Sequence, residues 1–259
     1  MFRRFRSNIN QILWKKNNIM KWENFKHQFH PSWHARLQPF IESEECDEIY
    51  AFLKKESKRG KEIAPLSSQV YRCFKETPLD EVKAVIVGMC PYHTFKDGLP
   101  VADGLLMGCS VTGYVQPSLA NFYKALETEF HRGLNLSYDA SPDVAYLAHQ
   151  GILMLNVALT TEKNKAGSHI AAWEPFTKYL FEEVLNHLGV PYVFLGKDAA
   201  AYKKYTGIFT HVFTLSHPAS ASYKGVDWDS EGVFTKVDTL IYETNGYSIS
   251  WLKDDEIPF

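Results

Sequence analysis

Four short apolar runs, separated by helical patterns, most restrict how this chain can fold. The runs cover residues 83–87 (KAVIV), 152–155 (ILML), 191–195 (PYVFL) and 211–215 (HVFTL). Such runs are typical of strands that are buried on both faces. Helical patterns cover residues 43–58, 118–130, 143–149, 174–188 and 231–243. Strands alternating with helices at this spacing predict an α/β fold, with a central parallel four-stranded sheet covered by helices on both faces.

The ends of these runs carry the candidate site. The residues that follow them are glycines or polar: Gly88, Tyr92 and His93 after the first run, Asn156 after the second, Gly196 and Lys197 after the third, and His217 after the fourth. In a parallel sheet, ligands bind beyond the carboxyl ends of the strands. Taken singly, each residue is more often a turn or capping residue than a catalyst. Together they favour one pocket that holds a planar ring.

Charge divides the chain into two parts. Residues 1–22 contain six basic and no acidic residues and therefore carry +6; since the whole chain carries −2, residues 23–259 carry −8. We predict a basic N-terminal extension over residues 1–22 and a single domain over residues 23–259. The extension could be a transit peptide, an arm that contacts nucleic acid or a plain disordered extension. Met20 is an alternative start of the protein.

Composition excludes several classes of protein. No apolar run reaches 18 residues and no secretory signal is visible, so we expect no membrane association and a cytoplasmic protein, or a nuclear one in a eukaryotic host. The four cysteines form no CxxC pair and have no histidine at metal-ligand spacing. This pattern predicts free thiols rather than disulfides or a zinc site, and we expect neither a metal nor a cofactor.

Five segments in order, within roughly residues 30–252, resemble the motifs of the family 1 uracil-DNA glycosylases. The family's Gly-Gln-Asp-Pro-Tyr-His is matched by residues 88–93 (GMCPYH), and its Pro-Pro-Ser-Leu by residues 116–119 (QPSL). Its Leu-Leu-Asn-x-x-Leu-Thr is matched within residues 153–160 (LMLNVALT), where Asn156 is in place. Its Gly-Ser loop is matched by Gly196-Lys197, and its His-Pro-Ser-Pro-Leu-Ser loop by residues 217–222 (HPASAS).

This resemblance implies hydrolysis of the N-glycosidic bond of deoxyuridine in DNA, after the base has left the stack. Asn156 would read the Watson–Crick edge of uracil, Tyr92 would exclude the methyl group of thymine, and Met89 and Met107 would complete the uracil pocket. His217 would donate a hydrogen bond to the uracil oxygen on which negative charge develops. The partner would be uracil-containing DNA, single- or double-stranded, and the protein would act as a monomer.

The resemblance also implies a set of residues that touch DNA. They lie in the segments that match the family's backbone-contacting loops: Pro117, Ser118, Gly196, Lys197, Ala219, Ser220, Ala221, Ser222, Tyr223 and Lys224.

Cys90 occupies the place of the family's catalytic carboxylate, which stabilises the sugar cation and orients water. A free thiol has a pKa near 8.5 and is mostly uncharged at neutral pH. The loss of such a charge can cost on the order of 10²–10³ in rate. The enzyme could run slowly on leaving-group stabilisation alone, or Asp97 or Asp103 could replace the carboxylate. Cys90 could also act as a covalent nucleophile, or hydrolysis could have been lost.

Three other departures from the family lie around the same site. Met107 stands where the family has a base-stacking Phe, and an insertion separates His93 from Asp103. The leucine that fills the vacated base stack falls near Ala221, so Tyr223 or Lys224 would have to compensate. The first hypothesis is therefore a base-excision glycosylase, divergent and slow. The alternative is a catalytically silent DNA-binding or replication-accessory module on the same fold.

Overall fold

A parallel four-stranded sheet forms the centre of the protein. The computed structural model describes residues 22–131, 140–208 and 210–253. Its strands are β2 (Ala84–Gly88), β5 (Ile152–Asn156), β7 (Tyr192–Leu195) and β8 (Val212–Leu215). They lie in the order β5-β2-β7-β8, and every neighbouring pair is parallel. The predicted sheet and its four strands are confirmed, with strand ends shifted by one residue.

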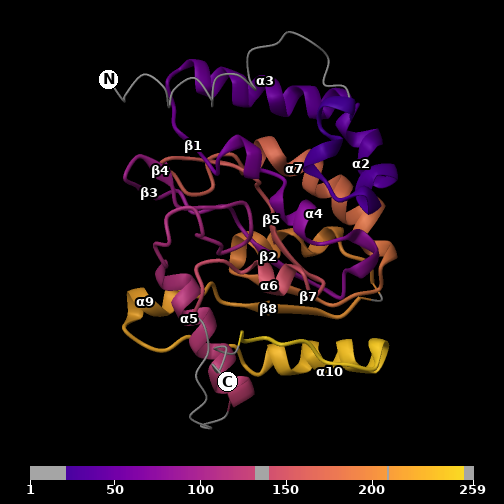
Figure 1. The fold of residues 1–259 in the computed structure, drawn as a ribbon, viewed down its shortest axis with the longest axis vertical. Helices are drawn as coiled ribbons and strands as arrows, with labels where there is room; N and C mark the ends of the chain where they lie inside the picture. The colour runs from indigo at the N-terminus through magenta and orange to yellow at the C-terminus, as the bar shows by residue number, and fades with distance from the viewer. Residues whose placement is uncertain (1–21, 132–139, 209, 254–259) are drawn as a thin grey trace, which may run out of the picture.

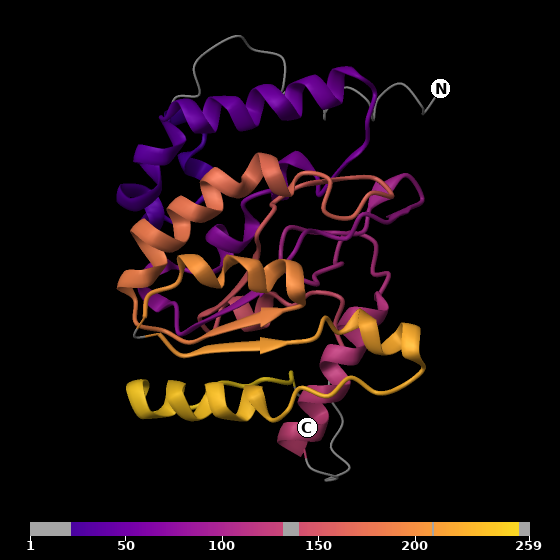
Figure 2. The same ribbon diagram turned by 180° about the vertical axis from the view of Figure 1, so that it is seen from behind.

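Helices surround the sheet. They are α2 (His34–Ile41), α3 (Glu44–Lys58), α4 (Arg72–Glu76), α5 (Pro117–Leu126), α6 (Ala145–Ala148), α7 (Ile170–Tyr179), α8 (Lys197–Ala200), α9 (Ala219–Lys224) and α10 (Val233–Asn245). Helices α2, α3 and α7 lie on one side of the strands and α10 on the other (Figure 1). The view from behind shows the same arrangement (Figure 2). None of the described helices is long and apolar enough to cross a membrane.

Shorter elements connect these parts. Two small antiparallel sheets pair β1 (Ile63–Ala64) with β6 (Thr161–Glu162) and β3 (Phe95–Lys96) with β4 (Leu99–Pro100). The 3₁₀ turns are η1 (Trp22–Asn24), η2 (Lys26–Gln28), η3 (Pro31–Trp33), η4 (Ser67–Gln69), η5 (Leu79–Glu81), η8 (Leu185–His187) and η9 (Ala201–Tyr205). Two π turns, η6 (Glu127–His131) and η7 (Leu180–Val184), extend α5 and α7.

The helices differ from the sequence predictions mainly at their ends. Helix α3 begins after Ser43, whose hydroxyl accepts the Cys46 N–H at 3.3 Å, as its capping pattern predicts. Helix α7 begins at Ile170 rather than at 174, because the burial of Trp173 and Phe176 extends the helix in front of Pro175. Helices α2, α4, α8 and α9 were not predicted. Helix α2 contains Pro39, a residue that sequence patterns associate with helix ends.

The folded part begins close to the predicted domain boundary. Trp22 is buried, and its ring stacks on Phe29 with the centroids 5.6 Å apart. Residues 1–21 of the predicted extension lie outside the described residues. The division into an extension and a single domain therefore stays a prediction.

The sheet is buried almost completely, as its apolar runs require. Every residue of β2, β5 and β7 is buried, and only the edge strand β8 is partly exposed. Strand β2 lies between β5 and β7, with Gly88 opposite Asn156 and Val87 opposite Phe194. Because β2 pairs with both neighbours, its register determines where β5 and β7 end relative to each other.

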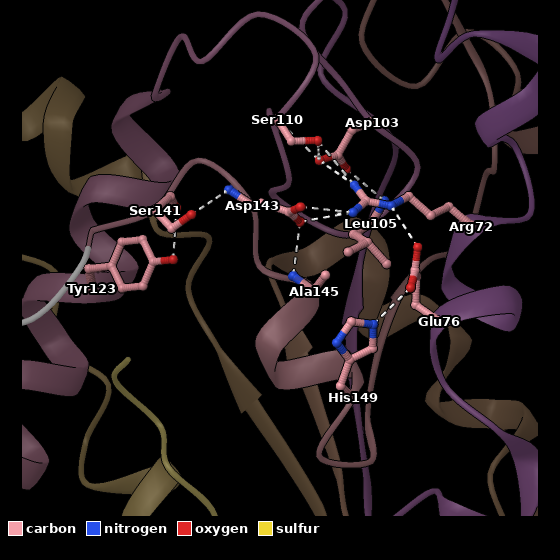
Figure 3. A network of polar contacts seen from close by, with 10 residues as sticks. All are labelled: Arg72, Glu76, Asp103, Leu105, Ser110, Tyr123, Ser141, Asp143, Ala145 and His149. Atoms are coloured by element: carbon pink, nitrogen blue, oxygen red, sulfur yellow. Dashed lines mark hydrogen bonds and ion pairs between the residues drawn. The ribbon is translucent and has the colours of Figure 1, made fainter. Parts of the chain in front are cut away.

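A network of charges centred on Arg72 supports the loop that follows the β3–β4 hairpin (Figure 3). The Arg72 guanidinium lies 2.7 Å from Asp103 and 2.9 Å from Asp143, and it also contacts Glu76 at 3.4 Å. Asp103 is completely buried and accepts the N–H groups of Leu105 at 3.1 Å and Ser110 at 3.0 Å. The network therefore shapes the chain from 103 to 110.

Replacing Arg72 with methionine should lower the free energy of unfolding by about 3 kcal/mol. The substitution leaves the buried Asp103 carboxylate without its cation while it keeps the apolar volume. Urea denaturation at pH 7 measures the change.

Arg59→Met is the matched control for this prediction. Arg59 also pairs with a glutamate, Glu56, at 2.9 Å, but its side chain is 57% exposed and Lys61 pairs with the same carboxylate. Its loss should cost less than about 1 kcal/mol. Equal losses in the two variants would contradict the role assigned to Arg72.

Candidate active site

The carboxyl ends of all four parallel strands meet at one edge of the sheet. Gly88 of β2 is opposite Asn156 of β5, and Leu195 of β7 is opposite Leu215 of β8. Cys90, Asn156, Gly196 and His217 lie within two residues of these strand ends. The predicted convergence of the four strand ends on one edge is therefore observed.

Asn156 presents an unsatisfied polar atom at this edge. Its side chain is 3% exposed, and its Oδ1 atom has no hydrogen-bond partner among the described residues. A Cβ atom at Gly88 would lie 3.1 Å from this oxygen and would overlap the Leu106 side chain, so glycine is needed there. A buried acceptor without a donor costs free energy, which a ligand that donates a hydrogen bond would recover.

The hydroxyl group of Tyr92 contacts helix α5. This hydroxyl lies 2.6 Å from the Ser118 hydroxyl in the first turn of α5. Burial raises the pKa of Tyr92, so the phenol is neutral. Ser118 was expected to touch DNA, and it also fits the capping pattern of a helix. It does not cap α5, which begins at Pro117 after the N-cap Gln116, and its buried hydroxyl positions Tyr92 instead.

His217 is a neutral hydrogen-bond donor. The Ala219 N–H donates to His217 Nδ1 at 3.1 Å, so the ring proton is on Nε2. Burial lowers the pKa of His217, and the charge of Asp198 partly opposes this shift. Gly196 lies directly against the imidazole, since a Cβ atom there would be 3.1 Å from His217 Cβ. The ring is therefore fixed in both orientation and tautomer.

Cys90 carries no charge in this environment. Its half-buried sulfur accepts the Gly167 N–H at 3.2 Å. Burial raises the pKa of the Cys90 thiol, so the thiol is protonated at neutral pH. A protonated thiol neither supplies a carboxylate charge nor has the thiolate character that a covalent nucleophile requires.

Met89, Met107 and His93, which were also predicted near this edge, differ in their burial and contacts. Met107 is buried with a positive φ of 62°, and Met89 lies near Gly167, where a Cβ atom would be 3.5 Å from Met89 Sδ. His93 is half-buried, and its Nδ1 atom has no hydrogen-bond partner among the described residues. The sequence analysis missed Leu106, whose side chain lies against Gly88 at the Asn156 oxygen. The resemblance to the family pointed to the next residue, Met107, instead.

Neither carboxylate predicted as a substitute is available to the site. Asp97 is exposed at the turn between β3 and β4, with a φ of 52°. Asp103 is completely buried, and its oxygens are taken by Arg72, Leu105 and Ser110. The alternative in which Asp103 replaces the catalytic carboxylate is therefore disfavoured, because this carboxylate already has a structural role.

The residues predicted to touch DNA divide by exposure. Five of them are exposed: Pro117, Lys197, Ser222, Tyr223 and Lys224. Gly196, Ala219 and Ser220 are half-buried, whereas Ser118 and Ala221 are buried. Ala221 is 4% exposed and packs into the core, so its side chain cannot fill a vacated base stack. Asn121 of α5 holds this loop by donating to the Pro218 carbonyl at 2.8 Å and the Ser222 hydroxyl at 2.9 Å.

Metal binding finds no support in the described part of the chain. No group of three or more histidine, cysteine, aspartate or glutamate side chains there is arranged to hold a metal ion.

Comparisons with known proteins agree with this geometry. Residues 74–236 match the profile of the Uracil DNA glycosylase superfamily. The uracil-DNA glycosylase of Pseudomonas fluorescens is 33% identical over 228 residues, which cover 85% of this chain and 94% of that protein. The Streptococcus pneumoniae enzyme is 33% identical over 229 residues, which cover 86% and 99%.

Solved structures share the fold. The crystal structure of mimivirus uracil-DNA glycosylase has a TM-score of 0.74 at 23% identity and covers 88% of this chain and 89% of its own. The structure from Nitratifractor salsuginis has a TM-score of 0.60 at 18% identity, with coverages of 87% and 98%. By the profile match and by its identity to curated relatives over most of both chains, this chain belongs to the uracil-DNA glycosylase family.

Proposed function

We propose that this protein removes uracil from DNA by hydrolysing the N-glycosidic bond of deoxyuridine. The pocket at the edge of the sheet would hold the extruded base, and His217 would stabilise the departing uracil. The alternative is a DNA-binding module that has kept the pocket and lost the reaction. Membership of the family supports the first function, and the neutral thiol of Cys90 favours the second.

The buried Asn156 amide is the observation that carries the proposal. Its unpaired Oδ1 atom can accept the N3–H of uracil while its NH₂ group donates to the neighbouring uracil carbonyl. Both groups belong to the Watson–Crick edge, which becomes accessible only when the base leaves the stack. A rigid amide that is already desolvated therefore matches uracil with little loss of entropy on binding.

Tyr92 supplies the means of excluding thymine. Thymine differs from uracil by a methyl group on C5, so a fixed ring against that position would reject it by steric overlap. The hydrogen bond to Ser118 and the burial of the ring hold Tyr92 in place. A side chain that cannot move away makes such exclusion effective.

His217 would act on the leaving group. As the C1′–N1 bond breaks, its electron pair moves to uracil and negative charge grows on the O2 oxygen. A neutral imidazole whose proton is on Nε2 can donate a hydrogen bond to that oxygen directly. The Ala219 N–H keeps the proton on this nitrogen throughout.

Extrusion of the base needs a side chain that fills the gap in the stack. Ala221 is buried, whereas Tyr223 in the same helix is 91% exposed. An exposed aromatic ring can stack on the neighbouring bases and stabilise the vacated site. We assign this task to Tyr223, two residues beyond Ala221, near which the family's leucine falls.

The remaining features of this function are proposals of the same kind. The substrate would be uracil-containing DNA, single- or double-stranded, and the protein would act as a monomer. It would work in the cytoplasm, or in the nucleus of a eukaryotic host. Incubation of the full chain with a uracil-containing oligonucleotide separates an enzyme from a silent module, since only the enzyme leaves abasic sites.

Asn156→Ala should reduce single-turnover cleavage of a uracil-containing oligonucleotide by about 30- to 150-fold. The variant loses two buried hydrogen bonds to the base, each of which contributes about 1–1.5 kcal/mol. Calorimetry should also show that the variant no longer binds free uracil.

Asn245→Ala is the control for this substitution, because Asn245 lies at the end of α10 and bonds only to the Ile241 carbonyl. It should cleave like the wild type. Undiminished cleavage by Asn156→Ala would mean that the base is read elsewhere.

His217→Ala should slow cleavage on the order of 10²–10³-fold and change DNA affinity by less than about twofold. The hydrogen bond from His217 forms to charge that exists only in the transition state. Single-turnover rates and fluorescence anisotropy with the same oligonucleotide give the two values. His211→Ala, an exposed site at the start of β8, serves as the control. A variant that lost DNA affinity and kept its rate would place His217 in DNA binding.

Lys197→Ala and Lys224→Ala should weaken DNA binding and reduce its dependence on salt. Both side chains are exposed, Lys197 at the start of α8 and Lys224 at the end of α9, where they can neutralise phosphates. Each lost phosphate contact should lower the slope of log K against log salt by about 0.9 on duplex DNA. Lys236→Ala on α10 is the matched control and should leave the slope unchanged. An unchanged slope in all three variants would exclude Lys197 and Lys224 from the DNA interface.

A further inference from the structure

Hydrolysis at this site needs a negative charge beside the sugar, and Cys90 does not provide it. The thiol is neutral, Asp103 is locked to Arg72, and Asp97 lies at the tip of the β3–β4 hairpin. An oxocarbenium-like transition state without an opposing charge is strongly disfavoured. Another carboxylate at the edge of the sheet would resolve this difficulty.

Asp198 lies at that edge. It is the second residue of α8, which follows β7 directly after Gly196. Gly196 lies against His217 and donates its N–H to the Leu215 carbonyl at 2.8 Å, so the start of α8 adjoins the His217 loop. Helix α8 also contacts β2, whose end leads to Cys90 two residues later. Helix α8 therefore begins beside the His217 loop and contacts the strand that leads to Cys90.

The electrostatics of the site agree with this placement. Burial is the larger influence on both pKa values: it raises that of Cys90 and lowers that of His217. The charge of Asp198 raises both pKa values. Asp198 is exposed and forms no hydrogen bond or ion pair with any described residue. Its carboxylate is therefore not occupied by a structural contact with the described residues, in contrast to that of Asp103.

We propose that Asp198 is the catalytic carboxylate of this protein and takes over the task that the family assigns to the position of Cys90. The assignment rests on the proposed glycosylase function. As the C1′–N1 bond breaks, its electrons leave with uracil and the sugar becomes cationic. The Asp198 carboxylate stabilises this cation and accepts a proton from the water whose oxygen forms the new bond to C1′. The proton then returns through solvent to the uracil anion.

Asp198→Asn tests the assignment because it removes the charge and keeps the shape. We expect single-turnover cleavage of a uracil-containing oligonucleotide to fall by about 100-fold or more. DNA affinity should stay the same or rise slightly, since a negative charge near the phosphates has been removed. Asp80→Asn is the matched control at an exposed position in η5, before the opposite end of β2, and should cleave like the wild type.

A second substitution distinguishes a catalytic charge from a structural role. Cys90→Asp places a carboxylate where the family has one, so the double variant Cys90→Asp, Asp198→Asn should recover most of the lost rate. A carboxylate at position 90 would not restore the rate if Asp198→Asn caused a purely structural defect. Wild-type cleavage by Asp198→Asn, or a defect that Cys90→Asp does not rescue, would overturn the assignment.

The wild-type chain in the same assay separates the two proposals. If the wild type leaves no abasic sites, the glycosylase function fails, and the role of Asp198 fails with it. If the wild type cleaves and Asp198→Asn cleaves equally fast, only the assignment of Asp198 fails.

Discussion

The parallel pairing of β2 with β5 on one side and β7 on the other is the constraint on which the rest of the structure depends. All three strands are buried along their whole length, so a shift in register would expose apolar residues or bury polar ones. The register places Gly88 opposite Asn156 and brings the four strand ends to one edge. Each loop that carries a candidate catalytic residue starts from this edge.

The chemistry of the site depends on a few neighbours that set the state of each side chain. A backbone N–H of Ala219 fixes the tautomer of His217, and the Ser118 hydroxyl holds Tyr92. Burial keeps both rings neutral, and it keeps the Cys90 thiol neutral as well. In the proposed reaction these groups would bind and polarise a neutral base, and the charge that opposes the sugar cation would come from another residue.

Arg72 shows how a polar residue that resembles a catalyst can have a structural task. Asp103 lies in the loop that carries Leu106, yet its carboxylate pairs with Arg72 and accepts hydrogen bonds from N–H groups of its own loop (Figure 3). The same loop carries Leu106 against Gly88, next to the unpaired Asn156 oxygen. The ion pair therefore helps to hold the loop that brings Leu106 against Gly88.

The sequence by itself determined the sheet, its strand ends and the candidate residues Tyr92, Asn156 and His217, because buried strands and their polar ends leave strong local patterns. Tertiary structure alone decided which carboxylate is free, since the pairing of Asp103 with Arg72 joins residues 31 positions apart. It also decided that Ala221 is buried while Tyr223 is exposed, and that Leu106 rather than Met107 lies against Gly88. Local patterns name residue types, but exposure and pairing depend on contacts between distant segments, which no short stretch of sequence contains.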